Sequence, residues 1–323
     1  MDVLRRINNE DALVAAAVAE ALPAVAAVVE LAVASLTVGG RVHYVGAGTS
    51  GRIAMLDAVE ISQTYGVPKD WFLAHHAGGL PALGELLEDV EDDETAGAMD
   101  TADVQRGDVV VGLSASGRSP YVLGALRQAR LVGASAVLVS GDPAAEYGSE
   151  VDVHVALSTG PEALTGSTRL KAAAAQKMVL NAISTATMIR LGFTYSNLMV
   201  GLLPTNAKLR GRALGVLMAA AGEDEPTCAG VLAEAGGDVA PERTRLGCPG
   251  RAGRRPGGRP GGAGMRVAVI FTSVGQEVGW TPRLCTPPPT RGLFGGLRAR
   301  SARRRNRRGR YWVGRLTPNT PGW

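Results

Sequence analysis

The sequence of 323 residues contains only three cysteines, and the first 227 residues contain none. The three, Cys228, Cys248 and Cys285, have no metal-ligand spacing, so a disulfide framework or a cysteine-based metal site in the core is excluded. Cysteine usage of this kind is typical of a reducing compartment, and we expect a cytoplasmic protein.

Long uninterrupted apolar runs are also missing. The most apolar segment, residues 12–38, is broken by Glu20, Pro23 and Glu30, and its apolar spacing is that of helices facing a core. No cationic stretch followed by an apolar run precedes it, so no signal peptide is expected. We therefore expect no contact with a membrane.

The last 84 residues contain no lysine and almost no acidic residues. Residues 240–323 hold 18 of the 34 basic residues and two of the 30 acids, which gives +16 there and −12 in the first 239 residues. We expect this Arg/Gly/Pro-rich, low-complexity tail to be disordered. Nucleic-acid binding is not expected, because no basic helix or recognisable nucleic-acid-binding fold accompanies the charge.

Strand-like and helix-like segments alternate through the first 215 residues. Short β-favouring runs predict strands at residues 41–45, 71–74, 108–113, 134–140 and 151–156. Apolar spacing predicts helices at residues 8–36 (two helices, or one helix kinked at Pro23), 50–62, 80–90, 119–131 and 169–191. This alternation predicts an α/β fold with a parallel sheet flanked by helices. We assign one domain to residues 1–215, the start of an incomplete C-terminal helical subdomain to 216–239, and the basic tail to 240–323.

A glycine- and hydroxyl-rich loop follows the first predicted strand. Residues 46–51 read GAGTSG and satisfy the G-x-G-x-x-G pattern of dinucleotide sites. A dinucleotide is nevertheless not favoured, because a long helical segment precedes the strand and no acid about 20 residues later ends a strand to hold a ribose. The hydroxyl groups of Thr49 and Ser50 at a helix N-terminus suit a single phosphate monoester.

Two further hydroxyl clusters repeat this design, at residues 114–119 and 165–168. Ser119 is placed to cap a helix that has Pro120 in its first turn, which leaves Ser114 and Ser116 free to donate to an anion. Each cluster alone is compatible with a plain helix cap, but three in one α/β domain favour phosphate binding. The candidate binding residues are Gly48, Thr49, Ser50, Gly51, Ser114, Ser116, Gly117, Arg118, Ser119, Thr165, Ser167 and Lys171.

Four separated motifs resemble those of the N-acetylmuramic acid 6-phosphate etherases, a family of the SIS (sugar isomerase) fold group. They are YVGAGTSGRIAMLDAVE at residues 44–60, VVVGLSASGRSPYV at 109–122, and the segments 164–192 and 197–210. The resemblance covers about residues 2–239. It implies cytosolic cleavage of the lactyl ether of N-acetylmuramic acid 6-phosphate to N-acetylglucosamine 6-phosphate and D-lactate, in cell-wall recycling. It also implies a homodimer with sites near the subunit interface, and no metal or organic cofactor.

The implied chemistry needs two carboxyl groups. Expelling an ether oxygen β to an aldehyde requires a base for the α-proton and an acid for the departing oxygen, and hydration uses the same pair in reverse. The resemblance assigns the acid to Glu60, in the D-A-x-E segment, and by spacing it assigns the base to Glu91. Glu60 lies on an otherwise apolar helix, so we expect its face to be partly buried. On sequence alone, Glu91 is one of six acids within residues 88–94, a composition typical of a solvated surface.

Two other functions stay open: a non-catalytic sugar-phosphate sensor and a sugar-phosphate isomerase, which would use the same loops. His75 and His76 have no partner at ligand spacing, so no metal site is expected. Arg52 and Arg118 either pair with phosphate or stiffen the loops. Lys177 meets substrate, a partner subunit or a neighbouring helix.

The sequence departs from the family pattern in two places, near the long helix and towards the C-terminus of the chain. Residues 172–175 are all alanine where the family usually carries glycine and threonine after the lysine. After Val239 the match stops abruptly, as a reading-frame shift in GC-rich coding DNA would cause. Resequencing that DNA tests this hypothesis, which fails unless a slip of one or two bases restores a helical, family-like end.

Overall fold

The computed structural model describes residues 1–85, 87, 89–202, 204 and 206–234. The predicted basic tail (240–323) and the last residues of the predicted helical subdomain (235–239) lie outside the described residues.

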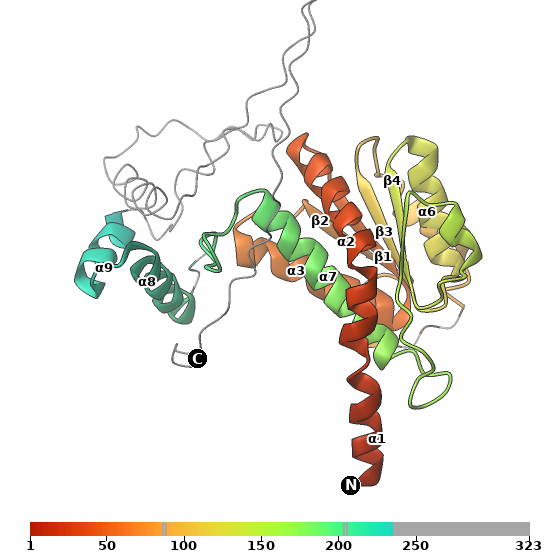
Figure 1. The fold of residues 1–323 in the computed structure, drawn as a ribbon. Coiled ribbons are helices and arrows are strands. Elements are labelled where there is room, and N and C mark those ends of the chain that lie inside the picture. Colours follow the sequence, from red (N-terminus) through yellow and green to blue (C-terminus); the bar gives the residue numbers. More distant parts are fainter. Residues whose placement is uncertain (86, 88, 203, 205, 235–323) are drawn as a thin grey trace, which may run out of the picture. The chain divides into compact units, whose positions relative to one another are not determined.

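Five strands form a single parallel sheet in the order β2-β1-β3-β4-β5 (Figure 1). Their bounds are β1 Val42–Gly46, β2 Phe72–His76, β3 Val109–Ser114, β4 Ser135–Ser140 and β5 Val153–Ala156. Every residue of β1 and β3 is buried, as is typical of a parallel sheet that is covered on both faces. The predicted sheet is therefore confirmed, with each strand within two residues of its expected range.

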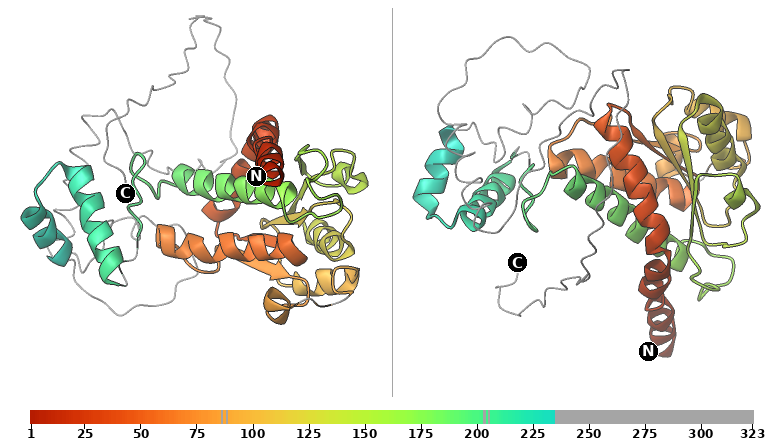
Figure 2. Two further views of the ribbon diagram at one scale, coloured as in Figure 1. Left: turned by 90° about the horizontal axis from the view of Figure 1, so that it is seen from below. Right: turned by 45° about the horizontal axis from the view of Figure 1, so that its top comes forward.

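One face of the sheet is covered by α2 (Val14–Thr37), α3 (Gly48–Tyr65) and α7 (Lys171–Arg190), which lie side by side in Figure 2. Their apolar side chains form the larger core cluster together with Val42 and Tyr44 of β1. Because side chains alternate along a strand, His43 and Val45 of β1 point to the opposite face.

The opposite face is covered by α6 (Pro120–Val132), and α5 (Glu94–Asp100) packs on α6. Two glycines allow a very close approach of these two helices. A Cβ atom on Gly97 would lie 1.9 Å from the Tyr121 backbone oxygen, and one on Gly124 would lie 1.9 Å from the Glu94 backbone oxygen. Backbone therefore meets backbone at both crossings, and neither position has room for a side chain.

The N-terminal segment forms two helices that are separated near Ala12 and not at Pro23. α1 (Asp2–Asp11) ends before Ala12, and α2 continues through Pro23, so of the two expected forms the single helix that contains Pro23 is the one observed. Proline removes one helix hydrogen bond, but α2 buries ten residues, and this burial outweighs the loss. Residues 2–37 are long and apolar enough to cross a membrane, and 39% of their most apolar part is buried in the structure.

The predicted helix at residues 80–90 is also wrong. Among the described residues of this range, only those of α4 (Pro81–Gly84) are helical, and Glu91 lies in a turn. Asp89 has a φ of 60°, a left-handed conformation that a right-handed helix cannot include. The side chain of Asp93 then caps α5 by accepting from the Ala96 amide at 2.8 Å.

The remaining elements are a short 3-10 helix (η1, Glu146–Ser149), α8 (Ala207–Ala221) and α9 (Glu225–Glu234). The last two helices pack on each other around a small cluster of their own, which includes Leu209, Ala213, Leu217 and Cys228.

Candidate active site

The first loop joins β1 to α3 through two glycines in direct contact. A Cβ atom on Gly51 would lie 2.5 Å from the Gly46 oxygen and 2.5 Å from Cδ2 of His76, so this glycine allows the close packing of helix on strand. Gly48 has a φ of +53° and open space around it. No side chain caps the first turn of α3, which leaves its backbone amides directed at the loop.

The second loop follows β3 and is organised by its own serines. The Ser114 hydroxyl accepts from the Ser119 amide at 3.4 Å, and the Ser116 hydroxyl accepts from the Arg118 amide at 3.2 Å. Ser119 occupies the N-cap position of α6, but its hydroxyl does not cap the helix as predicted. It donates instead to the backbone oxygen of Glu91, at 3.3 Å.

A pocket of about 370 Å³ lies between these two loops. Candidate residues of both loops line this pocket. Glu91 from the turn before α5 and Thr168 from the third hydroxyl cluster line it as well. Asp92, Thr168 and the small residues Ala47 and Ala115 line the pocket in addition to the predicted binding residues. The full lining is Ala47, Gly48, Thr49, Ser50, Glu91, Asp92, Leu113, Ser114, Ala115, Ser116, Arg118, Ser119, Pro120 and Thr168.

Glu91 is exposed and lies between two adjacent pockets. The second pocket, also about 370 Å³, shares Gly48, Glu91 and Asp92 with the first and adds Arg52 and His76. Glu91 is held through its backbone, because its carbonyl oxygen accepts from the Tyr121 amide at 3.0 Å as well as from Ser119. The backbone at Glu91 is thus fixed to the start of α6.

Glu60 does not line either pocket. It lies twelve residues beyond Gly48 on α3, roughly 18 Å along the helix axis at 1.5 Å per residue. The expectation that it is partly buried is wrong, because Glu60 is exposed. The helix buries Ala54, Asp57, Ala58 and Ile61 instead, and it turns Leu56, Val59 and Glu60 outward.

The third hydroxyl cluster is mostly separate from the pocket. Thr165, Ser167 and Lys171 do not line it. The Glu162 carboxylate accepts from the amides of Lys171 and Ala172 at 2.9 and 3.0 Å, so the first turn of α7 already has its anion. The Lys171 side chain is buried and pairs with Glu10 of α1. Gly51 and Gly117 do not line the pocket either. Each allows its loop to pack closely against neighbouring parts of the chain.

The two loop arginines differ in role. Arg52 donates to the backbone oxygens of Ala82 and Leu83 at 2.8 and 3.0 Å, so it stiffens the segment that follows β2. Arg118 is exposed, lines the pocket, and lies 3.3 Å from the carboxylate of Asp142.

A charged pair of buried Asp57 and half-buried Lys177 joins α3 to α7. Lys177 Nζ lies 3.2 Å from Asp57 Oδ1, and the Tyr44 hydroxyl donates to Asp57 Oδ2 at 3.3 Å. Burial raises the pKa of Asp57, and the neighbouring Lys177 lowers it in part. Lys177 therefore serves helix packing within this chain.

Comparison with known proteins agrees with this architecture. Residues 24–130 match the glucokinase regulatory protein N-terminal SIS domain, and residues 80–186 match the SIS domain. N-acetylmuramic acid 6-phosphate etherase from Thermobifida fusca is 54% identical over 238 residues, which cover 74% of this chain and 78% of that protein. The etherase of Symbiobacterium thermophilum is 49% identical (74% and 80% covered), and that of Cutibacterium acnes is 50% identical (73% and 79% covered). This chain belongs to the N-acetylmuramic acid 6-phosphate etherase family.

Proposed function

We propose that this chain is a carbon–oxygen lyase that cleaves the D-lactyl ether of N-acetylmuramic acid 6-phosphate in the cytoplasm. The products are N-acetylglucosamine 6-phosphate and D-lactate, and the role is in the recycling of cell-wall amino sugars. The observation that carries the proposal is the pocket in which both hydroxyl-rich loops meet Glu91.

The phosphate group is proposed to bind at the start of α3. The uncapped amides of that first turn and the hydroxyls of Thr49 and Ser50 supply donors, and the helix dipole favours the negative charge. Ser116 and Arg118 add donors from the opposite wall of the pocket. The sugar then extends from the phosphate towards Glu91.

Glu91 is proposed to act as the base. Its carboxylate removes the proton from C2 of the open-chain sugar, next to the C1 aldehyde, and the electron pair forms the C2–C3 double bond. The C3–O bond breaks, and the lactyl oxygen takes a proton from the acid. Water then adds at C3 while C2 regains a proton, which yields N-acetylglucosamine 6-phosphate. The exposed side chain of Glu91 at the pocket wall fits a group that contacts substrate.

The acid is proposed to be Glu60 of a second copy of this chain. Within one chain, Glu60 is separated from the phosphate loop by roughly 18 Å of helix, more than a single hexose spans. Leu56 and Val59, with side chains beside Glu60, are exposed apolar residues on α3, and Met178 is another on α7, which packs against α3. An apolar surface of this kind favours a homodimer through α3 and α7.

The direct test is release of D-lactate from N-acetylmuramic acid 6-phosphate by the purified full chain. We expect D-lactate and N-acetylglucosamine 6-phosphate in equal amounts. The second candidate is a non-catalytic sugar-phosphate sensor, which the distance of Glu60 from the pocket favours. A folded protein that binds the sugar phosphate but releases no lactate would establish the sensor and reject the lyase.

A further inference from the structure

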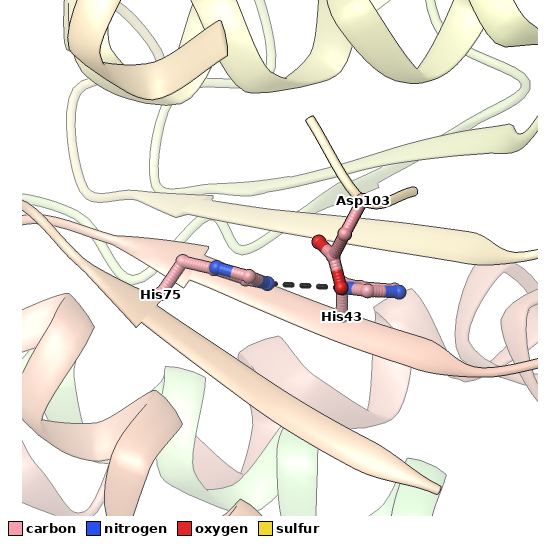
Figure 3. Close-up of side chains that lie close together, drawn as sticks. All are labelled: His43, His75 and Asp103. Carbon is pink, nitrogen blue, oxygen red and sulfur yellow. Dashed lines mark hydrogen bonds between the residues drawn. The ribbon is translucent and has the colours of Figure 1, made fainter. Parts of the chain in front are cut away.

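Two adjacent histidines at the end of β2 face opposite sides of the sheet. His75 points to the side that α6 covers, where its ring stacks on that of His43, with Nε2 of His75 2.9 Å from Nδ1 of His43 (Figure 3). Asp103 lies beside the same pair. Because side chains alternate along a strand, His76 points to the other side, towards α3. His75 thus has partners of its own, and His76 belongs to the surroundings of the first loop.

His76 is buried at the place where β2 meets that loop. It lies opposite Gly46 in the register of the sheet, and its Cδ2 lies 2.5 Å from the position of a Cβ atom on Gly51. The ring also lines the second pocket together with Gly48. The imidazole therefore packs against the loop that is proposed to bind the phosphate.

Both ring nitrogens of His76 face backbone carbonyl oxygens. Nε2 lies 3.2 Å from the oxygen of Gly48, and Nδ1 lies 2.7 Å from the oxygen of Ala77. A carbonyl oxygen can only accept a hydrogen bond, and a neutral imidazole has one N–H to donate, so a neutral ring satisfies one of these two contacts. With a proton on each nitrogen, the ring donates to both oxygens. The geometry thus fits the imidazolium form of His76.

An imidazolium at this position has no anion of its own. Within the described part of the chain, no carboxylate forms an ion pair with His76. The charged groups that line the same pocket are one half-buried cation and four exposed acids, Arg52, Glu85, Asp89, Glu91 and Asp92. Water and salt screen exposed charges, so these acids favour the imidazolium only weakly. A phosphate bound at the first turn of α3, next to Gly48, supplies the missing anion.

We propose that His76 is a positioning residue of the phosphate site and donates from both ring nitrogens when the phosphate monoester is bound. Gly48 has a φ of +53° and no atom within 4 Å of the position of its missing Cβ, so the bond from Nε2 restrains a residue that has little packing of its own. The positive charge of the ring also adds to that of the helix dipole at the same place. This role rests on the proposed phosphate site at the start of α3.

The dissociation constant of N-acetylglucosamine 6-phosphate, measured for the full chain and for His76→Gln between about pH 6 and pH 9, tests this role. Glutamine keeps a donor but carries no charge. We expect His76→Gln to weaken binding by about tenfold or more at the acid end, the usual effect of losing a hydrogen bond to a charged group. The loss should be clearly smaller at the alkaline end, where imidazoles are neutral. Titration of the ligand affects both chains equally, so the ratio of the two dissociation constants isolates His76.

His154→Gln is the matched control. His154 contacts Ser140 and lines neither pocket, and burial lowers its pKa, so its ratio should not change across this pH range. A ratio for His76→Gln that is constant with pH would overturn the proposal, because a purely structural role does not titrate. Failure of the unaltered chain to bind the ligand at any pH would instead reject the phosphate site itself.

A spectroscopic measurement on the unaltered chain covers the case in which His76→Gln does not fold. The chain has four histidines, and burial lowers the pKa of three of them, His43, His75 and His154. At pH 7, the ¹⁵N spectrum of the histidine-labelled chain with bound N-acetylglucosamine 6-phosphate should therefore show one doubly protonated ring, that of His76. A spectrum in which all four rings are neutral would overturn the proposal.

Discussion

The backbone amide of Tyr121 donates to the backbone oxygen of Glu91 at 3.0 Å. The same tyrosine donates its hydroxyl to Oδ2 of Asp100, at 2.7 Å. One buried residue at the start of α6 therefore holds both ends of the segment 91–100, which contains the proposed base and all of α5. The position of the base relative to the phosphate loops thus depends on a residue outside the pocket.

Tyr121→Phe removes only the hydroxyl of this anchor. We expect a loss of about 1.5–3 kcal/mol of stability, the usual value of a hydrogen bond to a charged group, because the Asp100 carboxylate loses a donor. Urea unfolding measures the effect. Tyr147→Phe is the control, since its buried hydroxyl has no hydrogen-bond partner among the described residues and should cost much less. Equal losses in the two variants would contradict the anchor.

Glu91→Gln should remove the base while the pocket stays intact. We expect lactate release to fall by about 10²–10⁴-fold, the usual contribution of a general base, with little change in binding of the sugar phosphate. Asp92→Asn is the matched control, because Asp92 is an adjacent exposed acid in the same pocket lining. Comparable losses in both variants would assign the effect to pocket charge and not to a base at position 91.

Mixing two inactive variants tests whether Glu60 acts across a homodimer. In a mixed dimer of Glu60→Gln and Glu91→Gln chains, one site has both glutamates and the other has neither. When equal amounts of the two variants are mixed and exchange subunits, lactate release should therefore recover to about a quarter of that of the unaltered chain. Lactate release before and after exchange measures this recovery. Recovery will be absent if both glutamates must come from one chain.

Gly97→Ala should separate α5 from α6. Its Cβ would lie 1.9 Å from a backbone oxygen that cannot rotate away, so we expect destabilisation of about 1–3 kcal/mol or more. Gly215→Ala, in α8, meets nothing within 4 Å and should stabilise the chain by up to about 1 kcal/mol. Thermal unfolding of both variants checks the contrast, and a neutral Gly97→Ala would show that the helices are not packed this closely.

Acid should weaken the fold through the buried histidines. The folded-state pKa of His43 is lowered from 6.5 to about 4, so the unfolded chain binds more protons between these values. The contribution of His43 to the free energy of unfolding is therefore fully present above pH 6.5, and it decreases as the pH falls towards 4. His75→Gln should flatten this fall, because it removes one lowered pKa and one cause of the other. Urea midpoints across this range provide the measurement, and an unchanged slope in the variant would count against the histidine pair.

The sheet and the first two loops were predictable because local chemistry determines them. Short, valine-rich apolar runs such as 109–113 favour a buried strand, and the glycines at 46, 48 and 51 mark a turn between strand and helix. These signals lie within a few residues of the structure they specify. Glu60 and Glu91, in contrast, rested on the family resemblance, and their catalytic roles remain proposals.

The errors arose where distant contacts prevailed over local preference. Helix-favouring acids around Glu91 predicted a helix, but the left-handed Asp89 and the anchor at Tyr121 produce a turn. The cluster before α7 has the composition of a phosphate loop, yet the Glu162 carboxylate already accepts from the amides of Lys171 and Ala172 at the start of that helix. His43 and His75 are 32 residues apart, so only the pairing of β1 with β2 brings them together.

The contact between Gly46 and Gly51 has a consequence for redesign of the ligand preference. At both positions an added methyl group would collide with fixed backbone, so substitution there would open the junction of β1 and α3. At Gly48 an added methyl group would meet nothing within 4 Å, and only the cost of its left-handed backbone, about 1–2 kcal/mol, opposes it. Of the three glycines in this loop, position 48 is the one through which a new side chain can reach a bound sugar.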